Sequence, residues 1–185
     1  MELIVWRHPK PHGVQGRCIG QTDVPVDRRK TKRLAHCIRR YARRHRLFVQ
    51  QTAVIWTSPL RRSFDVGRIL RGWGWAHHVD TRLSEVTFGA WEGQPWDAIA
   101  KADIDAWCDH FADTRPGGGE SVRQLLARCG EFVDEQRSQS TCWVVGHAGW
   151  INALAWRINH PENAPEAAEW PTPVQYGAQT ICVLP

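Results

Sequence analysis

Short runs of apolar residues alternate along this chain with segments whose apolar positions recur at helical spacing. Buried strands are predicted over 2–6, 52–57, 141–145 and 180–184, with a shorter strand near 78–80. Helices are predicted over 27–46, 59–71, 120–137 and 150–158, with one or two short helices within 95–111. Loops rich in Gly and Pro separate these elements. The pattern is that of helices alternating with continuously apolar strands.

This alternation predicts an α/β fold, a three-layer α/β/α sandwich with a mostly parallel central sheet covered by helices on both faces. The length of 185 residues suits one domain, and no internal repeat, low-complexity tract or linker divides it. We therefore expect a single domain over residues 1–185. Ser58 and Pro59 are expected to cap the helix that follows the second strand, as N-cap and first helical residue.

The charge is unevenly distributed. Ten Lys or Arg residues fall between Arg28 and Arg46, and no acidic residue occurs between Arg28 and Phe64, whereas the net charge is only +5. A basic region of this kind can attract phosphorylated substrates or polyanions. A non-catalytic polyanion-binding module is therefore one alternative, but the basic helix carries one aromatic residue, Tyr41, and no nucleic-acid motif, so nucleic-acid binding is disfavoured.

Composition gives expectations about location and about unusual residues. No apolar stretch approaches the roughly 20 residues that cross a membrane, and no signal-like region precedes the first strand, so a cytoplasmic protein is expected. The six Cys form no C-x-x-C pair, which argues against a zinc ribbon or a redox motif. Their even number permits disulfides, but in a protein that is not secreted six reduced, mostly buried thiols are expected. There are 11 Trp. Trp91, Trp96 and Trp107 could stack on a base, but packing in the core is the favoured interpretation.

Polar residues follow three of the predicted strands at their carboxyl ends, which is where open α/β sheets bind ligands. Arg7 and His8 follow the first strand, Ser58 and Arg62 the second, and His147 the third. Arginine forms bidentate hydrogen bonds with phosphoryl oxygens, and a neutral histidine can attack phosphorus. No Asp, Glu or Cys lies beside either histidine in the sequence, so neither a metal site nor a cofactor is expected.

Six motifs in order along the chain resemble those of the histidine phosphatase superfamily, also called the phosphoglycerate mutase-like family. The resemblance covers roughly Leu3 to Leu184 and is greatest to the α-ribazole phosphatase-like branch. The motifs are Arg7-His8, Gly20-Gln21-Thr22-Asp23, Ser58-Pro59-Leu60-Arg61-Arg62, Leu83-Ser84-Glu85 with Phe88-Gly89-Ala90-Trp91-Glu92-Gly93, Gly118-Gly119-Glu120-Ser121, and Val145-Gly146-His147-Ala148-Gly149.

The resemblance implies a phosphoric monoester hydrolase of the histidine acid phosphatase type, acting through a phosphohistidine. His8 would be the nucleophile and Glu85 the acid. Arg7, Arg62 and His147 would hold the phosphoryl oxygens, and Gln21 and Thr22 are further expected substrate-binding residues. No metal is implied.

The sequence departs from the family pattern in a few places. Pro9 replaces the glycine after the catalytic histidine and lacks the N–H that could face a phosphate, so an altered pocket is expected. Ser63 and Gly67 replace common alanines and stay small enough for close helix packing.

The resemblance implies a small phosphate monoester as substrate, and the branch suggests α-ribazole 5′-phosphate, in cobalamin biosynthesis. The alternative within the family is a 2,3-bisphosphoglycerate-type phosphoglycerate mutase. The short region from Trp91 to Glu120 leaves little room for the insertion typical of such mutases, which favours hydrolysis.

Overall fold

A five-stranded sheet forms the centre of the protein. The computed structural model describes residues 1–45 and 53–184, so the ends predicted at Arg46 and Thr52 lie outside the described residues. The strands are β1 (Glu2–Arg7), β2 (Val54–Thr57), β3 (Ala76–Val79), β4 (Thr141–Gly146) and β5 (Gln179–Val183), in the spatial order β3-β2-β4-β1-β5. Only β5 runs antiparallel to its neighbour. The prediction of a mostly parallel sheet is confirmed.

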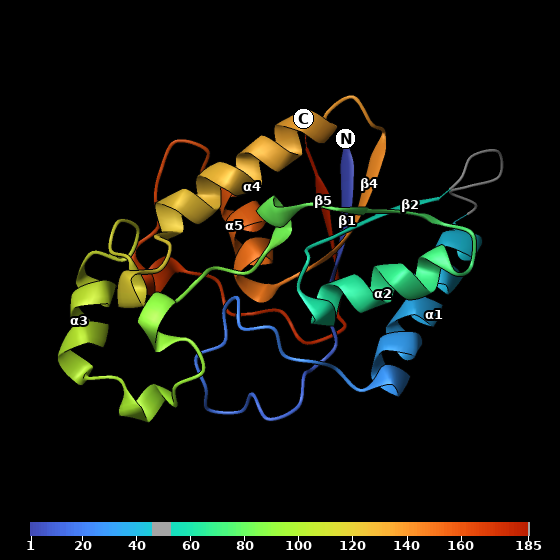
Figure 1. Ribbon diagram of the computed structural model, residues 1–185. Helices are drawn as coiled ribbons and strands as arrows, with labels where there is room; N and C mark the ends of the chain where they lie inside the picture. Colours follow the sequence, from blue (N-terminus) through green and yellow to red (C-terminus); the bar gives the residue numbers. More distant parts are fainter. Residues whose placement is uncertain (46–52, 185) are drawn as a thin grey trace.

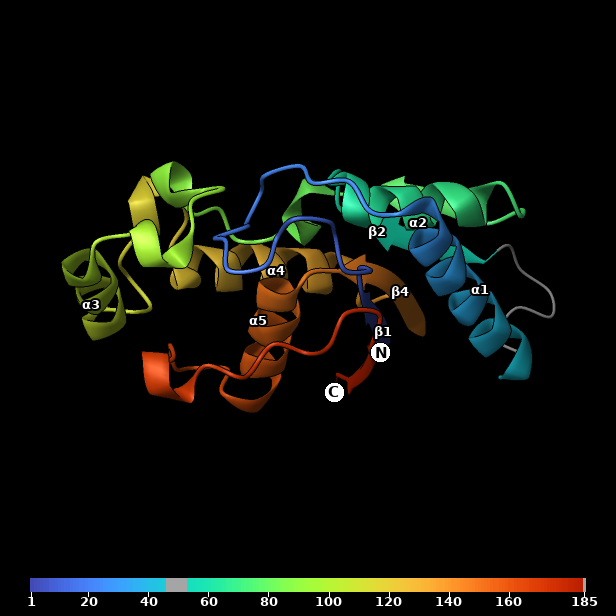
Figure 2. The ribbon, with the colours of Figure 1, turned by 90° about the horizontal axis from the view of Figure 1, so that it is seen from below.

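Helices cover both faces of the sheet, as Figure 1 shows. On one face lie α1 (Arg28–Arg44) and α2 (Arg61–Arg71); on the other lie α4 (Val122–Gln136) and α5 (Ala148–Asn159). The remaining helix, α3 (Lys101–Asp109), lies to one side of these layers (Figure 1 and Figure 2) and contributes no buried residue. The three-layer sandwich is therefore confirmed, with α3 as an addition to it.

Alternation along β1 explains why two cores form. Ile4 and Trp6 point into the core beneath α1 and α2, whereas Leu3 and Val5 point into the core beneath α4 and α5. Successive side chains of a strand face opposite sides of a sheet, so a strand that is apolar at every position is buried on both faces. The continuous apolar runs in the sequence therefore correspond to the central strands.

Helices α2 and α4 begin at other residues than predicted, because of the hydrogen bonds that nearby side chains form. Helix α2 begins at Arg61 with Leu60 as its N-cap, so the expected cap at Ser58 and Pro59 was wrong. The Ser58 hydroxyl instead lies 2.7 Å from His147 Nε2. Helix α4 begins two residues later than predicted, because Ser121 and Gln124 form a capping box.

The described residues bear on two expectations: that the cysteines are reduced and mostly buried, and that no segment crosses a membrane. All six Cys are free, and four of them are buried: Cys18, Cys129, Cys142 and Cys182. Burial raises the pKa of the Cys129 and Cys142 thiols to about 12, which keeps both protonated and unreactive. None of the helices in the described part of the chain has the length and apolarity needed to cross a membrane.

Two small residues let α2 approach the sheet closely. The Ser63 hydroxyl donates to the Val145 carbonyl at 2.5 Å. A Cβ added to Gly67 would overlap with His77 Nε2, and that nitrogen is hydrogen-bonded to Thr57 Oγ1 at 2.8 Å. The close packing expected from the small residues is thus present, and His77 is fixed where Gly67 meets it.

Replacing Gly67 with alanine is expected to destabilise the fold by about 1–3 kcal/mol, because the new methyl group overpacks against a ring that cannot easily move. Urea unfolding measures the free energy of unfolding. The same replacement in a His77→Ala background should cost much less, since the space is then open. Equal costs in both backgrounds would contradict the contact.

Candidate active site

Parallel pairing of β1 with β4 brings the two predicted histidines together. The register pairs Arg7 with Gly146, so His8 and His147 are the next residues on adjacent strands. The His8 backbone N–H donates to the Gly146 carbonyl at 3.0 Å, and the two imidazole rings lie 4.9 Å apart between centroids. The predicted convergence of the strand ends is confirmed.

The His8 ring is buried and oriented by the residue that follows it. His8 Nδ1 lies 2.8 Å from the Pro9 carbonyl oxygen, which can only accept, so Nδ1 carries the hydrogen and Nε2 keeps its lone pair. Burial lowers the His8 pKa well below its usual range, and the positive charges of Arg62 and Arg7 lower it further. His8 is therefore neutral near pH 7, as a nucleophilic nitrogen must be.

Arg62 and Ser58 hold the second histidine from both sides. Arg62 Nε donates to His147 Nδ1 at 3.3 Å, which leaves the hydrogen on Nε2, where it is donated to Ser58 Oγ at 2.7 Å. Burial lowers the pKa of His147 well below its usual range, with His8 and Arg62 adding to the effect. His147 is fully buried and does not line the cavity that opens beside His8 and Glu85, which is described below. This role of Ser58 is not visible in the sequence, because its position also fits a helix cap.

One buried nitrogen of the Arg7 side chain has no hydrogen-bond partner in the described part of the chain. Arg7 Nη1 donates to the Val174 carbonyl at 2.5 Å, and its guanidinium lies 3.7 Å from the centroid of the Tyr176 ring. Its Nε is buried and has no hydrogen-bond partner among the described residues. The ring of Tyr176 also lies 5.5 Å from the His8 ring. Tyr176 lies in an irregular stretch with no recognisable motif, so no sequence pattern pointed to it.

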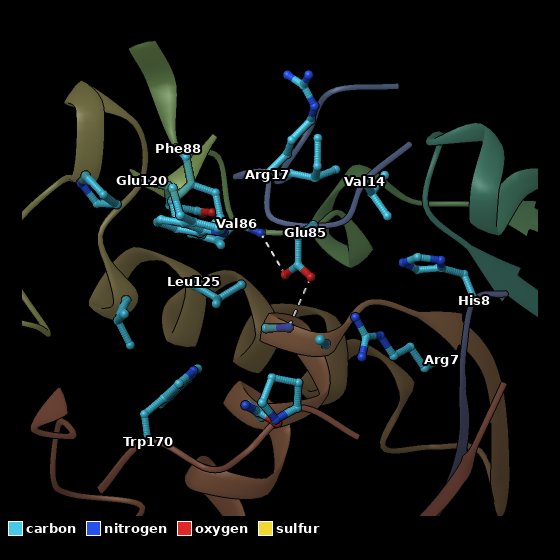
Figure 3. Close-up of a pocket in the computed structure, with 18 of the residues that line it drawn as sticks. Arg7, His8, Val14, Arg17, Glu85, Val86, Phe88, Glu120, Leu125 and Trp170 are labelled. Atoms are coloured by element: carbon cyan, nitrogen blue, oxygen red, sulfur yellow. Dashed lines mark hydrogen bonds between the residues drawn. The ribbon is translucent and has the colours of Figure 1, made fainter. Parts of the chain in front are cut away.

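The carboxylate of Glu85 is fixed by two backbone N–H groups. Its Oε1 accepts from Val86 at 3.0 Å and its Oε2 from Gly149 at 3.1 Å, in the first turn of α5. Figure 3 shows both bonds, with the carboxylate in the space between His8 and the far side of the cavity. A Cβ at Gly149 would overlap with Oε1, so only glycine leaves room for the carboxylate here.

Arg128 holds the chain that carries Glu85. Each of its five N–H donors is used: three bond the carbonyls of Arg82, Ser84 and Glu85, and two bond the Glu120 carboxylate. This links α4 to the backbone at Glu85 without contacting the cavity. Arg128 cannot be recognised from the sequence, because a single arginine inside a helix has no distinctive pattern.

Gln21 and Thr22, the other expected substrate-binding residues, do not line the cavity. The Gln21 side chain donates to the Glu85 carbonyl at 2.9 Å, and the Thr22 hydroxyl donates to Glu92. Glu92 also accepts the backbone N–H groups of Gly20, Gln21, Thr22 and Phe88. Burial opposes ionisation of Glu92, but these hydrogen bonds outweigh it and lower its pKa. The structure therefore places Gln21 and Thr22 in the loop that supports the site.

A cavity of about 340 Å³ opens beside these groups. Arg7, His8, Arg62 and Glu85 line one part of it, and most other lining residues are apolar. Trp96 and Trp107 line the cavity, whereas Trp91 is buried and does not. Helix α1, with its basic residues, contributes nothing to the lining. No cluster of three or more potential metal ligands occurs in the parts of the chain that the structure describes.

Known proteins resemble this chain in sequence and structure. A family model described as histidine phosphatase superfamily (branch 1) matches residues 3–182. A glucosyl-3-phosphoglycerate phosphatase from Mycolicibacterium vanbaalenii is 34% identical over 119 residues, which are 57% of this chain and 52% of that protein. The match thus spans about half the length of this curated relative.

Solved structures match over nearly the whole chain. A mycobacterial glucosyl-3-phosphoglycerate phosphatase in complex with VO3 has a TM-score of 0.77 and 27% identity, covering 97% of this chain and 91% of that one. A protein from Thermus thermophilus has a TM-score of 0.70 at 20% identity, covering 98% and 92% of the two chains. The second likeness concerns the fold alone.

The stability of the protein should fall as the pH is lowered from 7.5 to 5.5. His8 and His147 have lowered pKa values when folded, so the unfolded chain, with values near 6.5, binds more protons in this window. Each group contributes a slope of at most about 1.4 kcal/mol per pH unit. Urea unfolding of His8→Asn and of His147→Asn should give flatter profiles than the wild type. A slope unchanged in both variants would mean that the rings are not held neutral.

Proposed function

The chain belongs to the histidine phosphatase superfamily, and on this premise we propose that it hydrolyses a small phosphate monoester through a phosphohistidine at His8. The observation that carries the proposal is the state of His8. Its ring is neutral, its Nδ1 hydrogen is donated to the Pro9 carbonyl so that Nε2 keeps its lone pair, and Arg7 and Arg62 line the same cavity. A nucleophile for phosphorus needs these properties.

In the first step, His8 Nε2 attacks phosphorus and the bond from phosphorus to the leaving oxygen breaks. Arg7 and Arg62 offset the charge on the phosphoryl oxygens, and the buried Arg7 Nε supplies a donor that has no other partner in the described chain. The family resemblance also implies a phosphoryl contact for His147, but this ring does not line the cavity, and its two nitrogens are hydrogen-bonded to Arg62 and Ser58. Glu85 gives its proton to the leaving alcohol.

In the second step, water attacks the phosphorus of phospho-His8. Glu85, now a carboxylate, takes a proton from this water, and inorganic phosphate leaves as the bond to Nε2 breaks. The fixed position of the Glu85 carboxylate, between Val86 and Gly149, supports its use on the same side of the phosphorus in both steps.

The particular substrate has less support than the type of reaction. Relatives named glucosyl-3-phosphoglycerate phosphatase support a phosphatase, and they make that sugar phosphate one candidate. α-Ribazole 5′-phosphate and a role in cobalamin biosynthesis rest on the motif resemblance alone, and the relatives above do not support them. Comparing kcat/KM for the two compounds in one phosphate-release assay ranks them. The cytoplasmic location stays a prediction.

Phosphate release from p-nitrophenyl phosphate is expected in the presence of a metal chelator, because the protein groups in the proposed steps are all side chains and no step uses a metal ion. His8→Ala should lower kcat by several orders of magnitude, since the nucleophile is lost. Full activity in His8→Ala, or no activity in the wild type, would refute the proposal. Conversion of 3- to 2-phosphoglycerate that outpaces phosphate release would instead identify a mutase.

Glu85→Gln is expected to lower kcat about 10²–10⁴-fold with an alkyl phosphate, because the departing alkoxide then lacks a proton donor. With p-nitrophenyl phosphate the first step should lose far less, since nitrophenolate leaves without a proton. Burst kinetics separate this step from hydrolysis of phospho-His8. Equal losses of the first step with both substrates would remove Glu85 from the role of acid.

A further inference from the structure

Five aromatic rings form a continuous wall in the cavity, separate from the groups that carry the proposed chemistry. This aromatic wall consists of Phe88, Trp96, Trp107, Phe111 and Trp170, and all five line the cavity. Neighbouring rings contact one another along it. The centroid distances are 5.6 Å for Trp96–Phe88, 5.9 Å for Phe88–Trp107, 5.3 Å for Trp107–Phe111 and 5.6 Å for Phe111–Trp170.

The aromatic wall lies across the cavity from the nucleophile. In Figure 3, Glu85 stands between His8 and Arg7 on one side and Phe88 and Trp170 on the other. Since the proposed acid protonates the leaving oxygen, the leaving group of a bound ester extends past Glu85 toward this wall. The wall is therefore placed to contact the alcohol part of the substrate.

Polar groups near the wall are mostly engaged with the protein itself. The carboxylate of Glu120 is bonded to Arg128 at 2.6 Å, and Asn152 Nδ2 donates to the Pro171 carbonyl at 2.5 Å. Arg17, at the exposed rim, donates to the Gly93 carbonyl. Trp107 Nε1 is buried and has no partner among the described residues. A leaving group with many hydroxyls would lose hydrogen bonds to water here and regain few.

We propose that the substrate is a phosphate monoester whose alcohol carries a flat aromatic ring system, which packs against the aromatic wall; this inference rests on the proposed function. Edges and faces of the five rings offer the offset and edge-to-face contacts that aromatic groups prefer. The class of substrate thus differs from the glycosylated phosphoglycerate in the names of the relatives above.

Three esters of primary alcohols test the inference with similar leaving oxygens: 2-phenylethyl phosphate, 2-cyclohexylethyl phosphate and glycerol 3-phosphate. We expect kcat/KM to be highest for the phenyl ester, lower for the cyclohexyl ester, and lowest, by at least tenfold, for glycerol 3-phosphate. Equal values for the phenyl and cyclohexyl esters, or a preference for glycerol 3-phosphate, would overturn the inference while leaving the phosphatase proposal intact.

Variants of the aromatic wall test whether it causes the preference for the phenyl ester. Trp107→Leu and Trp170→Leu should each raise KM for the phenyl ester several-fold and lower the ratio of kcat/KM for this ester to kcat/KM for glycerol 3-phosphate. Trp73→Leu is the matched control, because Trp73 packs beneath α1 and α2, outside the cavity. An effect of Trp73→Leu as large as that of the wall variants would contradict the assignment.

Binding of unreactive analogues keeps the test independent of catalysis. We expect 3-phenylpropylphosphonate to bind at least tenfold more tightly than 3,4-dihydroxybutylphosphonate, as measured by titration calorimetry. This preference without hydrolysis of any ester would support the wall and refute the phosphatase proposal. Equal binding of the two phosphonates would refute the wall, whatever the activity.

Discussion

The in-register parallel pairing of β1 with β4 is the constraint from which the site is built. It places Arg7 beside Gly146 and thus His8 beside His147, and the His8 N–H extends the strand pairing by one bond. The apolar side chains of both strands are buried on both faces, and a slip by one residue would move them to the wrong core. The packing that stabilises the sheet therefore also sets the distance between the two imidazoles.

The polar loops of the site depend on two charged groups that do not react. Glu92 gathers the N–H groups of residues 20–22 and Phe88 around one carboxylate, and Arg128 gathers three carbonyls and Glu120 around one guanidinium. Buried backbone groups of irregular chain need such partners. The side chains of Glu92 and Arg128 thus supply the loops with hydrogen-bond partners, as neighbouring strands do within the sheet.

Most of the fold and the main candidate residues could be predicted from the sequence, because strand ends and helix periodicity are local patterns. His8, Arg62 and His147 follow apolar strands, and the parallel sheet brings them together. The roles of Ser58, Arg128 and Tyr176 could not be predicted, since each depends on a partner distant in sequence. Gln21 and Thr22 lie in a predicted motif, yet their side chains turn toward Glu85 and Glu92, which only the folded loop reveals.

The two parts of the cavity have different structural origins. The reactive part is formed mainly at the ends of the central strands, whereas most of the aromatic wall comes from the segment between β3 and α4. Helix α3 has no fully buried residue, although its Trp107 packs against the core beneath α4 and α5. The exposed positions of this helix can therefore vary at small cost to folding. Selectivity can evolve there while His8, Arg62 and Glu85 stay as they are.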